Sequence, residues 1–155
     1  MTREQFMAAS PTERDEAVAK ALGWKLESQR YGVVRCDEYH AHSWDMDRVE
    51  YVSKNTPGAQ EAPREVTAPD GSKRKSLPPL STDDGVALRH IAPWMNEELG
   101  YWELHCTFEG DCPTAANRRY VVTDCDRDPI AYGEPTIAHA LCLAVIGMEG
   151  EKHDS

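Results

Sequence analysis

The chain has 155 residues, with 27 Asp and Glu against 17 Lys and Arg, which gives a formal net charge of -10 and a pI near 5.0. A domain of this length can bury most of the surface that its unfolded chain exposes. A protein that follows the nucleic-acid backbone needs clustered Lys and Arg, and the one basic run, Lys73-Arg74-Lys75, is too short for that. Composition therefore predicts one domain, over 1–150, that does not bind nucleic acid.

Sequence signals for export or membrane insertion are missing. No apolar run approaches the roughly 20 residues that cross a bilayer, and the opening Met1-Thr2-Arg3-Glu4-Gln5 is not followed by the apolar stretch of a signal peptide. The cysteines are odd in number and irregularly spaced. We expect a cytoplasmic protein without membrane contact, whose cysteines are reduced thiols: Cys36, Cys106, Cys112, Cys125 and Cys142.

The first strong helix signal is Ser10-Pro11-Thr12-Glu13, in which Ser10 is placed as N-cap, Pro11 as the first helical residue and Glu13 as the partner in a capping box. The pattern predicts a helix from Pro11 to Leu22, ended by Gly23. Its apolar stripe is Ala17, Val18, Ala21 and Leu22, and its water-facing residues are Arg14, Asp15 and Lys20.

The next stretch predicts strands and a long loop. Tyr31 to Tyr39 is partly β-prone, and a second strand is expected around Arg48 to Val52. Residues 53–76 are rich in Pro, Gly, Ala and charge, with turn signals at Pro57-Gly58 and Pro69-Asp70-Gly71. This predicts a long loop, either a disordered insertion or a functional lid, which can contain a short hairpin about Asp70-Gly71.

The sharpest local signals lie between Leu77 and Gly100. Pro78-Pro79 enforces an extended approach, and Ser81 or Thr82 can then cap a helix whose apolar residues recur at helical spacing. Pro93 predicts that the helix kinks or ends there, and any continuation of the helix is expected to end at Gly100.

The C-terminal third predicts a meander and a helix. Tyr101 to Phe108 alternates, with Trp102, Leu104, Cys106 and Phe108 on one side. Further strands are expected at Arg118 to Thr123 and Pro129 to Tyr132. The helix Pro135 to Met148 is apolar all round, so it either fills the centre of a layer or joins a homodimer interface, and 151–155 is expected to be a disordered tail.

These elements predict an α+β fold, in which helices pack on a three- to five-stranded, mainly antiparallel sheet. The arrangement would be an αβα sandwich with one long Pro/Gly-rich loop.

Two clusters contain residues of the kinds that bind metal ions. Cys36, His40 and His42 form C-x3-H-x-H. Cys112 or His105 would be the fourth ligand of a zinc site, but the spacing matches no standard finger. Asp124, Asp126 and Asp128 resemble the first half of a calcium loop, but Pro129 and Pro135 occupy positions that need Gly and Glu. We expect no cofactor, a strand-end thiol beside two exposed imidazoles, and a solvated acidic turn.

The helix start at Ser81 carries two further hypotheses. A nucleophile there would need His90 or His139 as base, but no nucleophile elbow surrounds Ser81, so capping is the simpler interpretation and no catalytic residue is assigned. Alternatively, free N–H groups could bind the phosphate of a nucleotide-like ligand, although neighbouring aspartates oppose it. The ligand-binding candidates are Ser81, Thr82, Asp83, Arg89, Trp44 and Tyr101.

Four segments together resemble the phage alpha-beta-alpha sandwich domain family of small phage-encoded proteins. They are the turn Pro78-Pro79-Leu80-Ser81-Thr82-Asp83, the strand Tyr101 to Phe108, the helix from Glu134 to Met148, and the opening helix Asp15 to Trp24. The chain departs from the family pattern at Leu80 and Glu134.

The resemblance implies a phage or prophage protein acting in the cytoplasm of a bacterial host. Our first hypothesis is a non-enzymatic binding protein, and its concrete version is an anti-defence factor that sequesters a nucleotide signal or a defence protein. The alternatives are a phosphoester or nucleotide hydrolase using Ser81 and Thr82 with His90 or a metal, and a structural protein that forms a homodimer.

Overall fold

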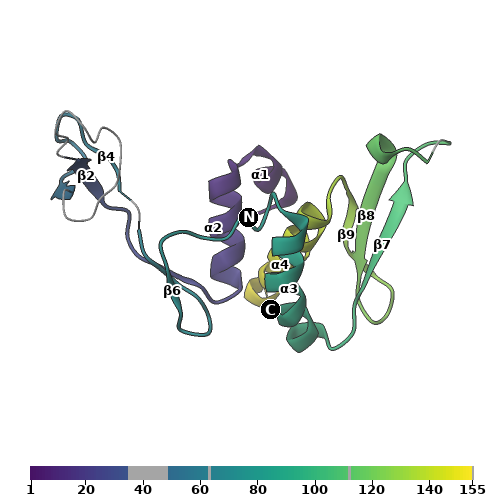
Figure 1. Cartoon of the computed structure of the whole chain (residues 1–155). Helices are drawn as coiled ribbons and strands as arrows, with labels where there is room; N and C mark the ends of the chain where they lie inside the picture. The colour runs from purple at the N-terminus through teal and green to yellow at the C-terminus, as the bar shows by residue number, and fades with distance from the viewer. Residues whose placement is uncertain (35–48, 63, 112, 155) are drawn as a thin grey trace. The chain divides into compact units, whose positions relative to one another are not determined.

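The computed structural model describes residues 1–34, 49–62, 64–111 and 113–154. Its contacts divide into two compact units where one domain was expected (Figure 1). We call Met1–Trp24 with Leu77–Ser155 the core unit, and Lys25–Ser76 the inserted unit. The α+β class is confirmed, and the strands form three antiparallel sheets of three strands each. Among the described residues, no helix is long and apolar enough to cross a membrane.

Two helices open the core unit. Helix α1 (Arg3–Ala8) was not predicted, and it starts with a capping box between Thr2 and Gln5. Helix α2 (Pro11–Ala21) has the predicted capping box between Ser10 and Glu13, and Gly23 follows it with a φ of 93°.

Helix α3 (Asp84–Leu99) starts later than predicted, because neither Ser81 nor Thr82 is its N-cap. Its N-cap is Asp83, whose carboxylate accepts the N–H of Val86 at 3.0 Å, so Ser81 and Thr82 belong to the preceding turn. The helix continues through Pro93, which is exposed, while Ile91 and Met95 on either side of it are completely buried. Burial of these two side chains offsets the backbone hydrogen bond that a proline removes. Gly100 ends the helix, as predicted, with a φ of 72°.

The predicted meander is present as the sheet β7-β8-β9. Its strands are β7 (Glu103–Phe108), β8 (Arg118–Thr123) and β9 (Pro129–Glu134). The alternation predicted for β7 holds only at its start, because Leu104 is half-buried but Cys106 and Phe108 are exposed. The last helix, α4 (Ile137–Asp154), packs on β9 and β8 and leaves the far end of β7 uncovered.

Helix α4 is the centre of the core unit. It packs against α3 and α2 as well as against the sheet (Figure 1). Its residues Ala138, Ala140, Leu141, Cys142, Leu143, Ala144 and Val145 are all buried. Of the two predicted roles, filling the centre of a layer is therefore the observed one, and the apolar surface of α4 does not require a second copy. The helix also extends into 151–155, where a disordered tail was expected.

The described part of the inserted unit contains six short strands: β1 (Lys25–Leu26), β2 (Tyr31–Val34), β3 (Val49–Val52), β4 (Gln60–Glu61), β5 (Val66–Thr67) and β6 (Lys73–Arg74). They form the sheets β3-β2-β4 and β1-β5-β6. The stretch 53–76 thus carries three strands where a long loop or disordered insertion was expected. The predicted hairpin is confirmed between β5 and β6, where Asp70 accepts the N–H of Ser72 and Gly71 has a φ of 89°.

Candidate functional site

The polar groups of Ser81 are used inside the core unit. Ser81 is 1% exposed, and its N–H donates to Oδ1 of Asp15 at 2.7 Å. Its hydroxyl donates to the carbonyl of Pro11 at 3.4 Å. The serine therefore joins α2 to the turn before α3, and its N–H is not available to a phosphate.

The neighbouring aspartates also bond within the core unit. Asp83 caps its own helix, whereas Asp84 accepts the N–H of Ala138 from the first turn of α4 at 2.9 Å. Thr82 is exposed beside them. Two carboxylates thus accept hydrogen bonds from N–H groups at the N-terminal ends of α3 and α4, where the helix dipole favours negative charge. A phosphate would have to displace these carboxylates from the same N–H groups.

The remaining ligand-binding candidates do not join this turn in the structure. Arg89 lies on the exposed surface of α3, more than one turn beyond Asp83. Tyr101 follows α3, is 57% exposed, and donates its hydroxyl to Glu103. Trp44 lies outside the described residues, as do the weak metal candidates Cys36, His40 and His42. Among the residues that are described, no group of three or more His, Cys, Asp or Glu could hold a metal ion.

His139 and Arg14 form a second polar contact near the start of α4. Arg14 donates to the carbonyls of Phe6 and Met7, both at 2.7 Å, and its Nη1 lies 3.4 Å from Nε2 of His139. Because a guanidinium can only donate, Nε2 must accept and the ring is neutral. Burial, and then the charge of Arg14, lowers the pKa of His139 below its usual value. The ring also packs edge-on against Phe6, with 5.7 Å between the centroids.

The one cysteine of α4 is not a nucleophile. Cys142 is completely buried, and its Sγ donates to the carbonyl of Leu80 at 3.3 Å. Burial raises the pKa of this thiol to about 12, so it stays protonated at neutral pH.

A shallow pocket of about 290 Å³ lies between β9, α4 and the N-terminal residues. Its wall is apolar, with Ile130, Leu143 and Ile146 among its residues. Its one acidic group, Glu134, is 1% exposed and accepts Nε of Arg3 at 2.7 Å. The buried charge is therefore compensated inside the chain, as buried charges generally must be.

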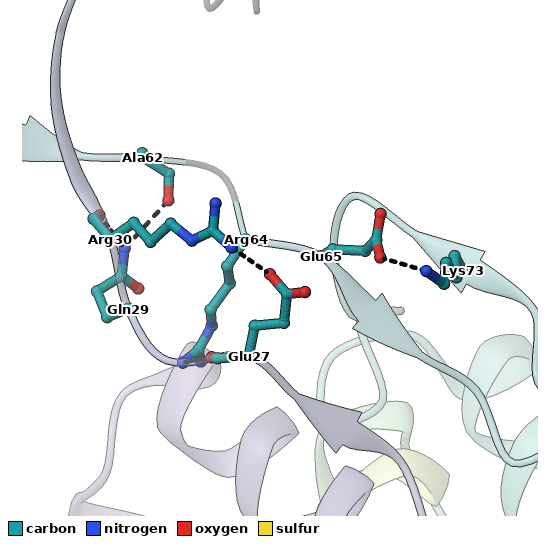
Figure 2. A network of polar contacts seen from close by, with 7 residues as sticks. All are labelled: Glu27, Gln29, Arg30, Ala62, Arg64, Glu65 and Lys73. Atoms are coloured by element: carbon teal, nitrogen blue, oxygen red, sulfur yellow. Dashed lines mark hydrogen bonds and ion pairs between the residues drawn. The ribbon is translucent and has the colours of Figure 1, made fainter. Parts of the chain in front are cut away.

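The inserted unit is held by polar contacts more than by an apolar core. Its described residues include only three buried apolar side chains, those of Ala62, Val66 and Ala68. Figure 2 shows a polar network that includes Ala62: Gln29 donates to the carbonyl of Ala62 at 3.0 Å. The other contacts of this network join Arg30 and Glu27 at 3.4 Å, Arg64 and the carbonyl of Glu27 at 3.4 Å, and Lys73 and Glu65 at 3.2 Å.

Cationic side chains cover aromatic rings on both faces of the β2-β3 pair. The guanidinium of Arg30 lies 5.4 Å from the ring centroid of Tyr51, and Nζ of Lys54 lies 6.0 Å from that of Tyr31. Tyr51 is directly opposite Gly32 in the register and is 45% exposed. The sequence analysis did not select these four residues. The contact between Arg30 and Tyr51 could have been predicted only from the strand register, because pairing of Gly32 with Tyr51 puts Arg30 and Tyr51 on the same face.

Comparison with known proteins adds no relative. No protein-family model matches the chain, and neither curated proteins nor solved structures gave a match. The resemblance to the phage alpha-beta-alpha sandwich domain family therefore stays a prediction.

Proposed function

We propose that this chain is a non-enzymatic binding protein whose inserted unit contacts a partner protein. The observation that carries the proposal is the contrast between the two units. Among the described residues, all buried apolar side chains except Ala62, Val66 and Ala68 belong to the core unit, whereas the inserted unit exposes Tyr51 beneath Arg30. Tyrosine and arginine are the residue types that most often dominate binding energy at protein interfaces.

Charge supports the same division of roles. The inserted unit contains nine Lys and Arg and nine Asp and Glu, so the whole net charge of -10 belongs to the core unit. A neutral unit of mixed charge avoids the long-range repulsion that an acidic surface would exert on an acidic partner protein.

The setting of this activity follows from the resemblance alone. In a phage or prophage protein the partner would be a bacterial host protein, and the specific class of partner that we propose is a defence protein. Protein capture is preferred to sequestration of a nucleotide signal because the N–H of Ser81 is already bonded to Asp15. It is preferred to hydrolysis because the Ser81 hydroxyl donates to a carbonyl oxygen and the Cys142 thiol is protonated.

The test begins with native mass spectrometry of the tagged chain purified from bacterial lysate. A protein that copurifies is then produced separately and titrated against the chain and against the variants Tyr51→Ala and Arg30→Ala. We expect a complex whose Kd rises tenfold or more in either variant. Tyr132→Ala is the matched control, because Tyr132 is 74% exposed in the core unit. A bound nucleotide, a converted product, or a complex indifferent to both variants would contradict the proposal.

A further inference from the structure

Within the part of the chain that the structure describes, the outer edge of β7 presents unpaired backbone groups at alternate residues. The N–H of Glu109 donates to the carbonyl of Asn117 at 2.8 Å, which continues the register that pairs Phe108 with Arg118. Hydrogen-bonded and non-hydrogen-bonded pairs alternate in an antiparallel ladder. Hence the odd-numbered residues of β7 bond to β8, and the N–H and C=O groups of Leu104, Cys106 and Phe108 point away from β8.

The two edges of this sheet differ. Strand β9 begins at Pro129 and its pairing with β8 contains register shifts, two features that protect an edge from further pairing. Strand β7 pairs with β8 over six consecutive residues without a shift. Between Glu103 and Glu109 its sequence, Leu-His-Cys-Thr-Phe, contains no proline and no lysine, and Phe108 is 44% exposed. The edge at β7 is regular and partly apolar, so it is the one able to accept another strand.

We propose that β7 pairs antiparallel with β7 of a second copy of this chain, about a twofold axis at Cys106. Only the outward-pointing residues can form the new bonds, and centring the pair on Cys106 uses all of them. Cys106 then faces Cys106 of the second copy, and Leu104 faces Phe108, with two hydrogen bonds exchanged in each pair. This dimer buries the exposed part of Phe108 and does not involve the inserted unit, so it stands independently of the proposed function.

Charge and area determine how strong this dimer is. Each core unit carries the full net charge of -10, so two copies repel one another. Glu103 faces Glu109 of the second copy at each end of the pairing, although in its own chain Glu103 contacts His105 at 2.7 Å and Glu109 contacts Arg119 at 2.9 Å. Pairing of one six-residue strand also buries less than the roughly 1,200 Å² of stable interfaces. The dimer is therefore weak, and it strengthens with added salt, which screens the repulsion.

Sedimentation equilibrium of the full chain at low and high ionic strength tests this directly. We expect a monomer–dimer equilibrium whose Kd falls as salt is added. Cys106→Pro removes only an outward N–H and should abolish the dimer, while its control Cys106→Ser keeps that N–H and should dimerise like the natural chain. Phe108→Glu should also abolish the dimer, because it removes the apolar ring and adds to the repulsion between the copies without altering the backbone. A chain that is monomeric at every salt concentration, or a dimer kept by Phe108→Glu, would overturn the proposal.

A cross-link tests the register. Cα atoms of a hydrogen-bonded antiparallel pair are about 5.5 Å apart, within the roughly 4.4–6.8 Å that a disulfide bridges. In a chain with Cys36, Cys112 and Cys125 changed to Ser, oxidised glutathione should join two Cys106 thiols. The two thiols lose two protons and two electrons, which reduce the glutathione disulfide to two thiols. Peptide mapping should find the Cys106–Cys106 link at high salt, and failure to form it there would exclude this register.

Discussion

The carboxylate of Asp15 shows how a single side chain joins distant segments. It accepts the N–H of Ser81 at 2.7 Å, and Ser81 is 1% exposed. In Asp15→Ala this buried N–H loses its partner, which costs about 1–3 kcal/mol. We expect urea denaturation to show a free energy of unfolding lower by that amount. Asp15→Asn keeps an acceptor oxygen and should lose less, and Thr12→Ala, on the exposed side of α2, should change little. An equal decrease in the free energy of unfolding in all three variants would show that the hydrogen bond between Asp15 and Ser81 does not stabilise the fold.

His139 makes stability depend on pH. Burial and Arg14 lower its pKa in the folded chain, while the unfolded chain keeps a value near 6.5. As the pH falls below 6.5, the unfolded state binds a proton before the folded state does, so stability decreases until the folded pKa is reached. In His139→Gln this part of the decrease should vanish. Chemical denaturation at a series of pH values, with His105→Gln as the exposed control, measures it, and parallel curves for the natural chain and His139→Gln would contradict the assignment.

The predictability of these residues depends on where their partners lie in the sequence. The capping box of Ser10 and Glu13 closes within four residues, and it was predicted correctly. Asp15 was assigned to the solvent face of α2 because its partner, Ser81, is 66 positions away and has no local signature. The contact of Arg14 with His139 was not predicted for the same reason, because the two residues are 125 positions apart. Of the predicted ligand group, Arg89 and Tyr101 lie on helix α3 and just after its end, and their distance from Ser81 in the fold had no local signature either.

At the scale of elements, helix α1 depends on tertiary contacts. Its six residues are far fewer than an isolated helix needs in water. Phe6 is completely buried, and Arg14 donates to the carbonyls of Phe6 and Met7. We expect Phe6→Ala to cost about 3–5 kcal/mol and to increase amide hydrogen exchange throughout α1. Met7→Ala, which truncates a 37% exposed side chain of the same helix, is the control. Unchanged exchange in α1 after Phe6→Ala would show that other contacts hold the helix.

Element boundaries were predictable where periodicity was long and capping was local. Strand β8 matches its predicted bounds, and α2 differs by one residue. Helix α1 and strands of two residues, such as β4 and β5, are too short to show a period, so 53–76 looked like a loop. Helix α3 continues past Pro93 because burial of Ile91 and Met95 overrides a local signal.

The whole molecule divides apolar burial and charge unequally. The core unit holds the large buried side chains around α4 together with the full net charge, and the inserted unit is neutral and built on polar contacts. The described residues of the inserted unit bury few apolar side chains, so they contribute little hydrophobic free energy of their own. The proposed function therefore predicts that stability and recognition are separable properties of this chain.

This separation predicts the result of removing the inserted unit. If Lys25–Ser76 is replaced by a Gly/Ser linker of about 10 residues, which reaches on the order of 15–20 Å, the core unit should still fold. We expect one cooperative thermal transition, measured by circular dichroism, with a midpoint close to that of the full chain, because the buried side chains around α4 are all kept. The same variant should lose the partner protein but keep the salt-dependent dimer. An unfolded variant would assign the inserted unit a structural role, and a variant that still binds the partner would place the binding surface on the core unit.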